Sequence, residues 1–160
     1  MANVFSASEI VELGIKIEEN GRDFYGILLK FSKNDKAKAL FKILADEEAK
    51  HIESFRNILD NVKRYDPAEA YPEEYFSYIK ALSKDNIFTK DNKGAEVARN
   101  IKDDQEAIDL GIKFERESIL FYENIKKVVL ESEKNIIDTL IEEEKKHLNR
   151  LLSLKGDKHG

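Results

Sequence analysis

The 160-residue chain contains no cysteine. Without cysteine the chain cannot form a disulfide, a thiolate zinc site, an iron–sulfur cluster or a rubredoxin-type iron site. Any redox chemistry at a bound metal must therefore use nitrogen and oxygen ligands. The chain also has only two prolines, Pro67 and Pro72. With so few helix breakers, and with apolar residues recurring at helical spacing, the sequence predicts an all-α fold.

Long apolar runs are absent too. No stretch approaches the roughly 20 apolar residues that a membrane span requires, and the first residues lack the basic and apolar regions of a signal peptide. We therefore expect no membrane partner and a cytoplasmic location. Asp and Glu outnumber Lys and Arg by 32 to 27, which gives a formal net charge of -5. This balance disfavours nucleic acid and anionic lipid as partners and favours small cations.

Two sequence blocks occur twice. Residues 13–25 read LGIKIEENGRDFY and residues 110–122 read LGIKFERESILFY, while LADEEAKHI at 44–52 returns as LIEEEKKHL at 140–148. The first block carries a lone Glu seven residues before a Tyr, and the second carries a Glu-x-x-His pair. Each half of the chain therefore holds half of one candidate site. These residues are Glu18, Tyr25, Glu48 and His51 in the first half, and Glu115, Tyr122, Glu144 and His147 in the second.

Capping signals predict four long helices. Ser6 with Glu9 forms a capping box that opens a helix to about Phe31, and Asp103 with Glu106 opens the equivalent third helix, to about Leu130. The second helix starts at Asn34 or Asp35 and runs to about Arg64, and the fourth starts at Ser132 and runs to about Leu154.

The connection over residues 65–102 is too long for a structureless loop inside a compact domain. We expect it to contain structure of its own, including a short helix over residues 72–83, which begins at a proline. Two antiparallel hairpins joined by one long crossover form the ferritin-like four-helix bundle. A hydrophobic content of 41% is enough for one core, so residues 1–160 are expected to form a single domain.

The candidate residues interrupt apolar helix faces. The neighbours of each lone Glu at helical spacing are apolar or small, and each Glu-x-x-His pair interrupts an otherwise apolar stripe. A buried, unpaired carboxylate costs several kcal/mol, so four in one core require protons or cations. Two divalent ions balance four negative charges. The sequence therefore predicts a dinuclear metal centre whose ligands are Glu18, Glu48, His51, Glu115, Glu144 and His147.

Helical geometry suggests a role for each ligand. A Glu and a His three residues apart share a helix face, so we expect Glu48 and Glu144 to bridge two ions and each His to bind one. Glu18 and Glu115 would then be terminal ligands. Carboxylates tolerate both divalent and trivalent iron, and manganese or zinc is also compatible with this ligand set.

Further residues have two interpretations each. Glu47 and Glu143 are either hydrogen-bond acceptors for the metal-binding histidines or solvated surface charges. Tyr25 and Tyr122 either donate hydrogen bonds to ligand carboxylates, which makes them further catalytic candidates, or are core aromatics. In addition, Gly14 and Gly111, each one turn from a lone Glu, are expected to leave room for metal or substrate.

With this ligand set on two hairpins, nearly the whole chain resembles the ferritin-like di-iron carboxylate superfamily, and within it the rubrerythrin-like branch. The resemblance implies two iron ions that reduce hydrogen peroxide or dioxygen, with the six ligands acting in catalysis through the metal. It also implies a homodimer. Rubrerythrins typically carry a cysteine-ligated rubredoxin domain for electron delivery. Because this chain has no cysteine, its electrons would come from an external donor protein.

Other departures from the family patterns bear on function. Ser118 stands where rubrerythrins carry an additional Glu, which weakens the expectation of peroxidase activity. The ligand set also resembles bacterioferritin, but Ala49 replaces the haem-binding methionine, and the residues after His147 are too few for a fifth cage helix. Haem binding and cage storage are therefore disfavoured. Two alternative functions remain open: a ferroxidase that sequesters iron, and a non-catalytic structural metal-binding bundle.

Overall fold

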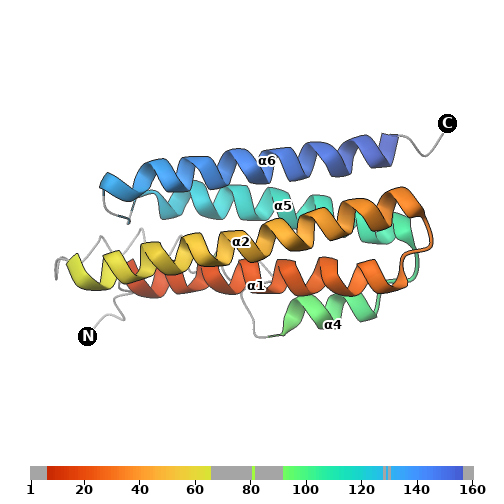
Figure 1. The fold of residues 1–160 in the computed structure, drawn as a ribbon, viewed down its shortest axis with the longest axis horizontal. Coiled ribbons are helices and arrows are strands. Elements are labelled where there is room, and N and C mark those ends of the chain that lie inside the picture. Colours follow the sequence, from red (N-terminus) through yellow and green to blue (C-terminus); the bar gives the residue numbers. More distant parts are fainter. Residues whose placement is uncertain (1–6, 66–80, 82–91, 128, 130, 157–160) are drawn as a thin grey trace.

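The computed structural model describes residues 7–65, 81, 92–127, 129 and 131–156. Over these ranges the chain is helical apart from short connections (Figure 1), which confirms the predicted all-α class. The helices are α1 (Ala7–Phe31), α2 (Asp35–Tyr65), α4 (Lys93–Arg99), α5 (Asp104–Ile125) and α6 (Lys134–Gly156), with a 3-10 helix η2 (Glu131–Glu133) before α6.

The four long helices form two antiparallel hairpins. Helix α1 packs against α2 and α5 packs against α6, and the hairpins meet with α1 beside α5 and α2 beside α6 (Figure 1). Helix α2 ends at the opposite end of the bundle from the start of α5, so the connection between them crosses the length of the bundle. This is the predicted four-helix topology with one long crossover.

The predicted caps explain where two helices begin. The Asp103 side chain accepts a hydrogen bond from the Glu106 N–H at 2.8 Å, and the Glu106 carboxylate accepts one from the Lys102 N–H at 3.1 Å. These two bonds satisfy backbone donors at the start of α5. At the start of α2, the Asn34 side chain accepts from the Ala37 N–H at 3.1 Å. Ser6 lies outside the described residues.

Two helix boundaries differ from the prediction. Helix α5 ends at Ile125 and not near Leu130. The α-helical hydrogen-bond pattern changes there to a 3-10 pattern, because the Lys127 N–H donates to the carbonyl three residues earlier, at 3.2 Å. Helix α6 begins at Lys134, after a 3-10 turn that contains Ser132. Such tight turns are frequent at helix ends, and cap residues alone do not reveal them.

The crossover has structure of its own, as predicted. Helix α4 lies against α1 (Figure 1), and the Gly94 N–H donates to the buried side chain of Asn20 at 2.9 Å. A Cβ atom on Gly94 would lie only 2.0 Å from the Asn20 carbonyl oxygen. The short helix predicted over residues 72–83 lies outside the described residues except for Ala81, which is helical.

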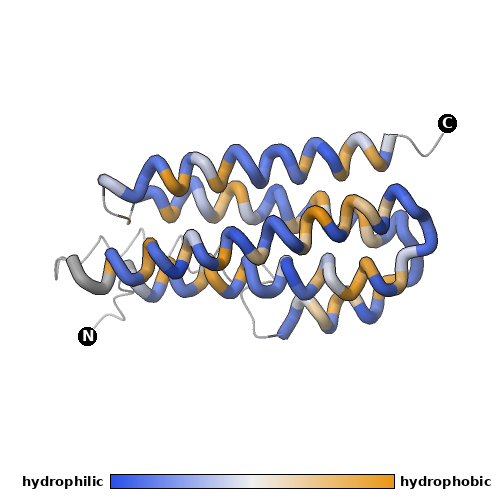
Figure 2. Tube along the Cα trace, viewed as in Figure 1, coloured by the Kyte–Doolittle hydropathy of each residue, from blue (hydrophilic) through white to orange (hydrophobic). Residues whose placement is uncertain are grey.

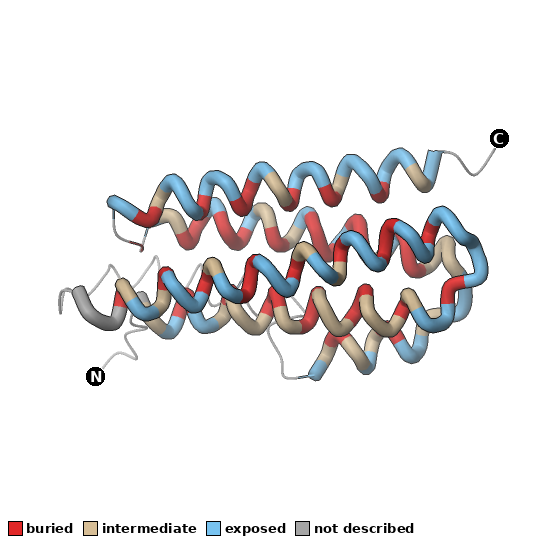
Figure 3. The backbone as a smooth tube through the Cα atoms, viewed as in Figure 1, coloured by how far each residue is buried: buried red, intermediate tan, exposed pale blue. Residues whose placement is uncertain are grey.

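Each long helix turns an apolar face inward and a polar face outward (Figures 2 and 3). On both sides of the Glu-x-x-His pairs the core is apolar, and Leu44 and Phe55 from α2 belong to the same buried cluster as Leu140 and Leu151 from α6. The predicted apolar stripes are buried, except that Leu148 is half-buried. None of the described helices combines the length and the apolar character needed to cross a bilayer.

We predict that Gly94→Ala lowers the free energy of unfolding by roughly 1 to 3 kcal/mol, because the new methyl group cannot fit against α1. Gly26→Ala is the matched control, since a Cβ there meets nothing within 4 Å. It should leave stability unchanged or raise it by up to about 1 kcal/mol. Urea unfolding measures both variants. Equal stabilities would contradict the close contact between α4 and α1.

Candidate metal centre

The structure brings all six predicted ligand residues together in the middle of the bundle. Each is at most 2% exposed. They form two groups, and within each group one ligand atom per residue lies within 4.8 Å of the others. The first group is Glu18, Glu48, His51 and Glu144, and the second is Glu48, Glu115, Glu144 and His147.

The two groups share Glu48 and Glu144, the residues predicted to bridge. Glu144 Oε1 lies 2.8 Å from Nδ1 of His51, and Glu48 Oε1 lies 3.0 Å from Nδ1 of His147. Each shared carboxylate therefore reaches the imidazole of the opposite hairpin. The two imidazole rings are nearly parallel, with centroids 5.6 Å apart. A carboxylate that bridges two metal ions must lie close to the other ligands of both ions, as Glu48 and Glu144 do.

The cluster leaves many buried polar atoms without a hydrogen bond. Oxygen and nitrogen ligands bind divalent ions at about 2.1 Å, so atoms bound to one ion lie roughly 3 Å apart. The separations of 2.8 and 3.0 Å between the imidazoles and the shared carboxylates match this spacing. The residues therefore fit a pair of metal ions. The unsatisfied atoms are Glu18 Oε2, both oxygens of Glu48, His51 Nδ1, Glu115 Oε2, both oxygens of Glu144, and His147 Nδ1.

Each histidine is oriented by a carboxylate of the opposite hairpin. Nε2 of His51 bonds the carboxylate of Glu143, and Nε2 of His147 bonds that of Glu47. This confirms the hydrogen-bonding interpretation of Glu47 and Glu143. A proton on Nε2 directs Nδ1 toward the cluster and increases its basicity as a ligand.

The two tyrosines make equivalent contacts between α1 and α5. The Tyr25 hydroxyl donates to Glu115 Oε1 at 2.7 Å, and the Tyr122 hydroxyl donates to Glu18 Oε1. The hydrogen-bonding role of both tyrosines is therefore confirmed. Burial and the charge of Glu115 raise the pKa of Tyr25, which keeps its hydroxyl protonated as a donor. Each lone Glu is left with one oxygen, Oε2, for a metal ion.

Burial and mutual charge set the protonation of the metal-free cluster. Burial and the negative charge of Glu144 raise the pKa of Glu48 well above its usual value. Burial alone would lower the pKa of His147, but the carboxylates of Glu115 and Glu144 raise it to about 12. Metal-free carboxylates and imidazoles therefore share protons, which metal ions would displace.

One sequence expectation at the cluster is wrong. A Cβ on Gly14 would lie 3.0 Å from the Phe55 ring, and a Cβ on Gly111 would lie 3.2 Å from Leu151. The space beside both glycines is therefore filled by core side chains and is not open to metal or substrate. Large side chains of neighbouring helices pack there. The sequence pattern of one helix does not reveal which side chains of other helices contact it.

Gly21 is the small residue that lies beside the ligands, and the sequence pattern did not single it out. A Cβ there would lie 2.6 Å from the Phe114 ring and 3.3 Å from Glu48 Oε2. Its equivalent in the repeat, Ser118, is fully buried and donates its hydroxyl hydrogen to the Phe114 carbonyl at 2.9 Å. Comparing the two copies position by position would have found this pair.

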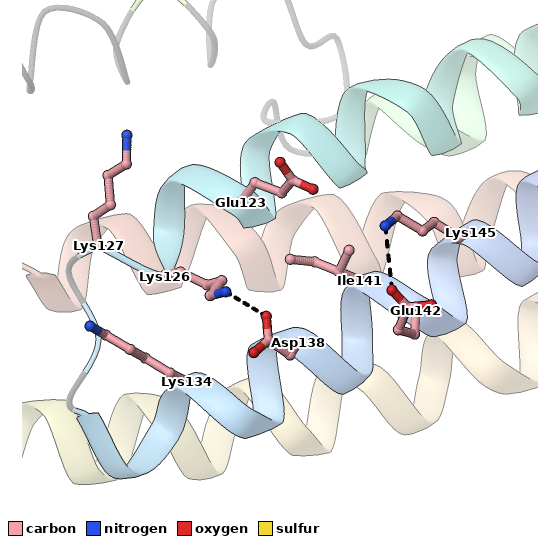
Figure 4. A pocket seen from close by; sticks show the side chains of 8 residues that line it. All are labelled: Glu123, Lys126, Lys127, Lys134, Asp138, Ile141, Glu142 and Lys145. Carbon is pink, nitrogen blue, oxygen red and sulfur yellow. Dashed lines mark hydrogen bonds and ion pairs between the residues drawn. The ribbon is translucent and has the colours of Figure 1, made fainter.

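A surface pocket of about 560 Å³ lies elsewhere on the α5–α6 hairpin (Figure 4). None of the six ligand residues lines it. Several of its charges form ion pairs: Lys126 binds Asp138 at 2.6 Å and Lys145 binds Glu142 at 3.3 Å. We assign it no part in the metal centre. Its lining residues are Glu123, Lys126, Lys127, Lys134, Asp138, Ile141, Glu142 and Lys145.

Comparisons with known proteins agree with this geometry. A family model described as rubrerythrin matches residues 9–155. Among solved structures, a protein from Thermotoga maritima described as a ferritin-like diiron-carboxylate protein is 25% identical to this chain, with a TM-score of 0.68. The alignment covers 97% of each chain. A comparison with curated proteins found no match.

We predict that Glu143→Gln and Glu47→Gln each weaken ferrous-ion binding roughly 10- to 100-fold, because the imidazole loses a charged acceptor behind it. Glu142→Gln is the matched control: it removes the same charge from the neighbouring position, where Glu142 pairs with Lys145 and with no other group of the described residues. Anaerobic titration measures all three affinities. An equal loss in the control would show that only net charge matters.

We also predict that metal binding releases protons and strengthens as the pH rises. The pKa of His147 near 12 means that this residue is protonated at neutral pH in the metal-free protein, whereas a metal ligand must be deprotonated. Calorimetric titration in two buffers of different ionisation enthalpy measures the number of protons released. Zero proton release at pH 7 would contradict the assigned protonation.

Proposed function

The chain belongs to the rubrerythrin family, and on that premise we propose that it reduces hydrogen peroxide or dioxygen at two iron ions, with electrons from an external donor protein. One observation carries the proposal. Eight buried nitrogen and oxygen atoms from four helices converge without hydrogen-bond partners, and two carboxylates are shared between the groups. We assign Glu48 and Glu144 as bridging ligands, Glu18 and Glu115 as terminal ligands, and one His to each ion.

The charge around the cluster fits ions that change between the divalent and trivalent states. Two divalent ions balance the four ligand carboxylates. Glu47 and Glu143 add two negative charges directly behind the imidazoles, so they offset the extra charge of trivalent ions.

The chain's own residues hold the site rigid and dry. The tyrosine hydroxyls fix Glu18 and Glu115, and the carboxylates of the opposite hairpin fix both imidazoles. Two ferrous ions bound there would supply the two electrons that, with two protons, convert one hydrogen peroxide to two waters. Full burial of the ligands excludes bulk water and strengthens every charge interaction in the cluster.

We predict that metal-free protein binds two ferrous ions per chain under anaerobic conditions. Rapid mixing with one equivalent of hydrogen peroxide should then oxidise them much faster than air-saturated buffer does. Near-ultraviolet absorption of the oxidised centre measures both rates. Faster oxidation by dioxygen, with loading beyond two ions per chain, would instead identify an iron-sequestering ferroxidase.

The double variant Glu48→Ala/Glu144→Ala tests the assignment of the bridging ligands. Loss of both shared carboxylates should abolish binding of the ion pair, because each ion loses two of its four protein ligands. Circular dichroism confirms that the variant is folded. Retention of two ions per chain would contradict the assignment.

A further inference from the structure

Within the described ranges, the only hydrogen-bonded contacts from the ligand residues to partly exposed side chains lie between α2 and α6. The side chains of Glu143 and Glu47 are 41% and 33% exposed, and each bonds a ligand histidine directly. On the α1–α5 side, by contrast, Tyr25 and Tyr122 are fully buried. On this edge of the bundle, a single hydrogen-bonded side chain therefore separates each ligand histidine from solvent.

Two exposed lysines lie on that edge. Lys50 and Lys146 occupy equivalent positions in the repeat, one residue before each ligand histidine. Spacing of three residues places them on the same helix faces as Glu47 and Glu143, respectively. Both lysines are exposed, and neither has an ion-pair partner among the described residues.

The carboxylates nearest to these lysines in sequence are already engaged. Those beside Lys50 bind other groups: Asp46 pairs with Lys42, and Glu53 pairs with Arg56. The same holds on α6, where Glu142 pairs with Lys145, one turn further along the helix. Glu47 and Glu143 bond the ligand histidines. The positive charge of both lysines is therefore available to a partner.

Apolar surface accompanies these charges. Ile43 on α2 is 42% exposed and Ile136 on α6 is 36% exposed. A shallow groove of about 300 Å³ lies between Leu40 of α2 and Arg150 and Leu154 of α6. Arg150 also lies on this edge, where it pairs with Glu47 at 3.5 Å. Exposed apolar groups among cations form a surface suited to a protein partner with an acidic rim.

We propose that this α2–α6 edge, centred on Glu47, Lys50, Glu143 and Lys146, is the docking surface for a small acidic one-electron carrier protein. The inference rests on the proposed function, which requires an external donor. Each docking event delivers one electron and oxidises one carrier, so two carriers return the oxidised ion pair to the ferrous state for each peroxide reduced to two waters. Electrons enter beside the histidines, where the ligands lie nearest to solvent.

Charge reversal on this edge tests the proposal. Oxidised, iron-loaded protein is mixed anaerobically with reduced flavodoxin, a strongly acidic carrier, and the rate of flavin oxidation is followed by stopped-flow absorbance. At low salt, reduced flavodoxin should reduce the double variant Lys50→Glu/Lys146→Glu at least about tenfold more slowly than the wild type, because electrostatic steering is lost. The wild-type rate should fall with added salt and approach that of the variant.

The matched control reverses two equivalent lysines on the opposite edge. Lys16→Glu/Lys113→Glu changes the net charge of the protein by the same amount, but on α1 and α5. Its rate with flavodoxin should stay close to that of wild type. Photoreduced riboflavin, a neutral donor that needs no charged docking surface, should reduce all three proteins at similar rates.

Each other outcome overturns the proposal. Equal slowing of both double variants would show that only net charge matters. Reduction by riboflavin but not by flavodoxin would exclude an acidic carrier, and a change in mass of the Lys50→Glu/Lys146→Glu variant by light scattering would show that a second copy covers this edge. If riboflavin-reduced protein consumes no peroxide, the proposed function fails, and the docking surface fails with it.

Discussion

Four carboxylates buried in one bundle core are the constraint on which the rest of this structure depends. Glu18, Glu48, Glu115 and Glu144 are all fully buried, and such charges are untenable in an apolar core without compensation. Hydrogen bonds from the tyrosines use one oxygen of each lone Glu. The remaining oxygens and both Nδ1 atoms converge without hydrogen bonds, so metal ions are the compensation that fits.

The same contacts hold the two hairpins together. Tyr25 and Tyr122 connect α1 with α5, and the bonds of His51 and His147 connect α2 with α6, each across the hairpin boundary. Neither hairpin has a complete ligand set for either ion. Each ligand group is therefore complete only when the two hairpins have come together, and bound metal should stabilise the folded chain.

The sequence predicted the fold class, the topology and all six clustered residues, because the repeat marked equivalent positions and the helical period placed them on apolar faces. It could not decide the roles of Glu47, Glu143 and the tyrosines, since these depend on how the hairpins meet. The error at Gly14 and Gly111 has the same origin: Phe55 and Leu151, from other helices, fill the space beside them. The end of α5 at Ile125 depends on a local tightening that capping signals do not encode.

The central claim is that two metal ions occupy the two four-residue groups that share Glu48 and Glu144. Anomalous X-ray diffraction at the iron absorption edge, on crystals loaded anaerobically with ferrous ions, tests it most directly. We expect two peaks per chain, one bound by Glu18 and His51, the other by Glu115 and His147, with both shared carboxylates between them. A single peak, or peaks outside the cluster, would contradict it.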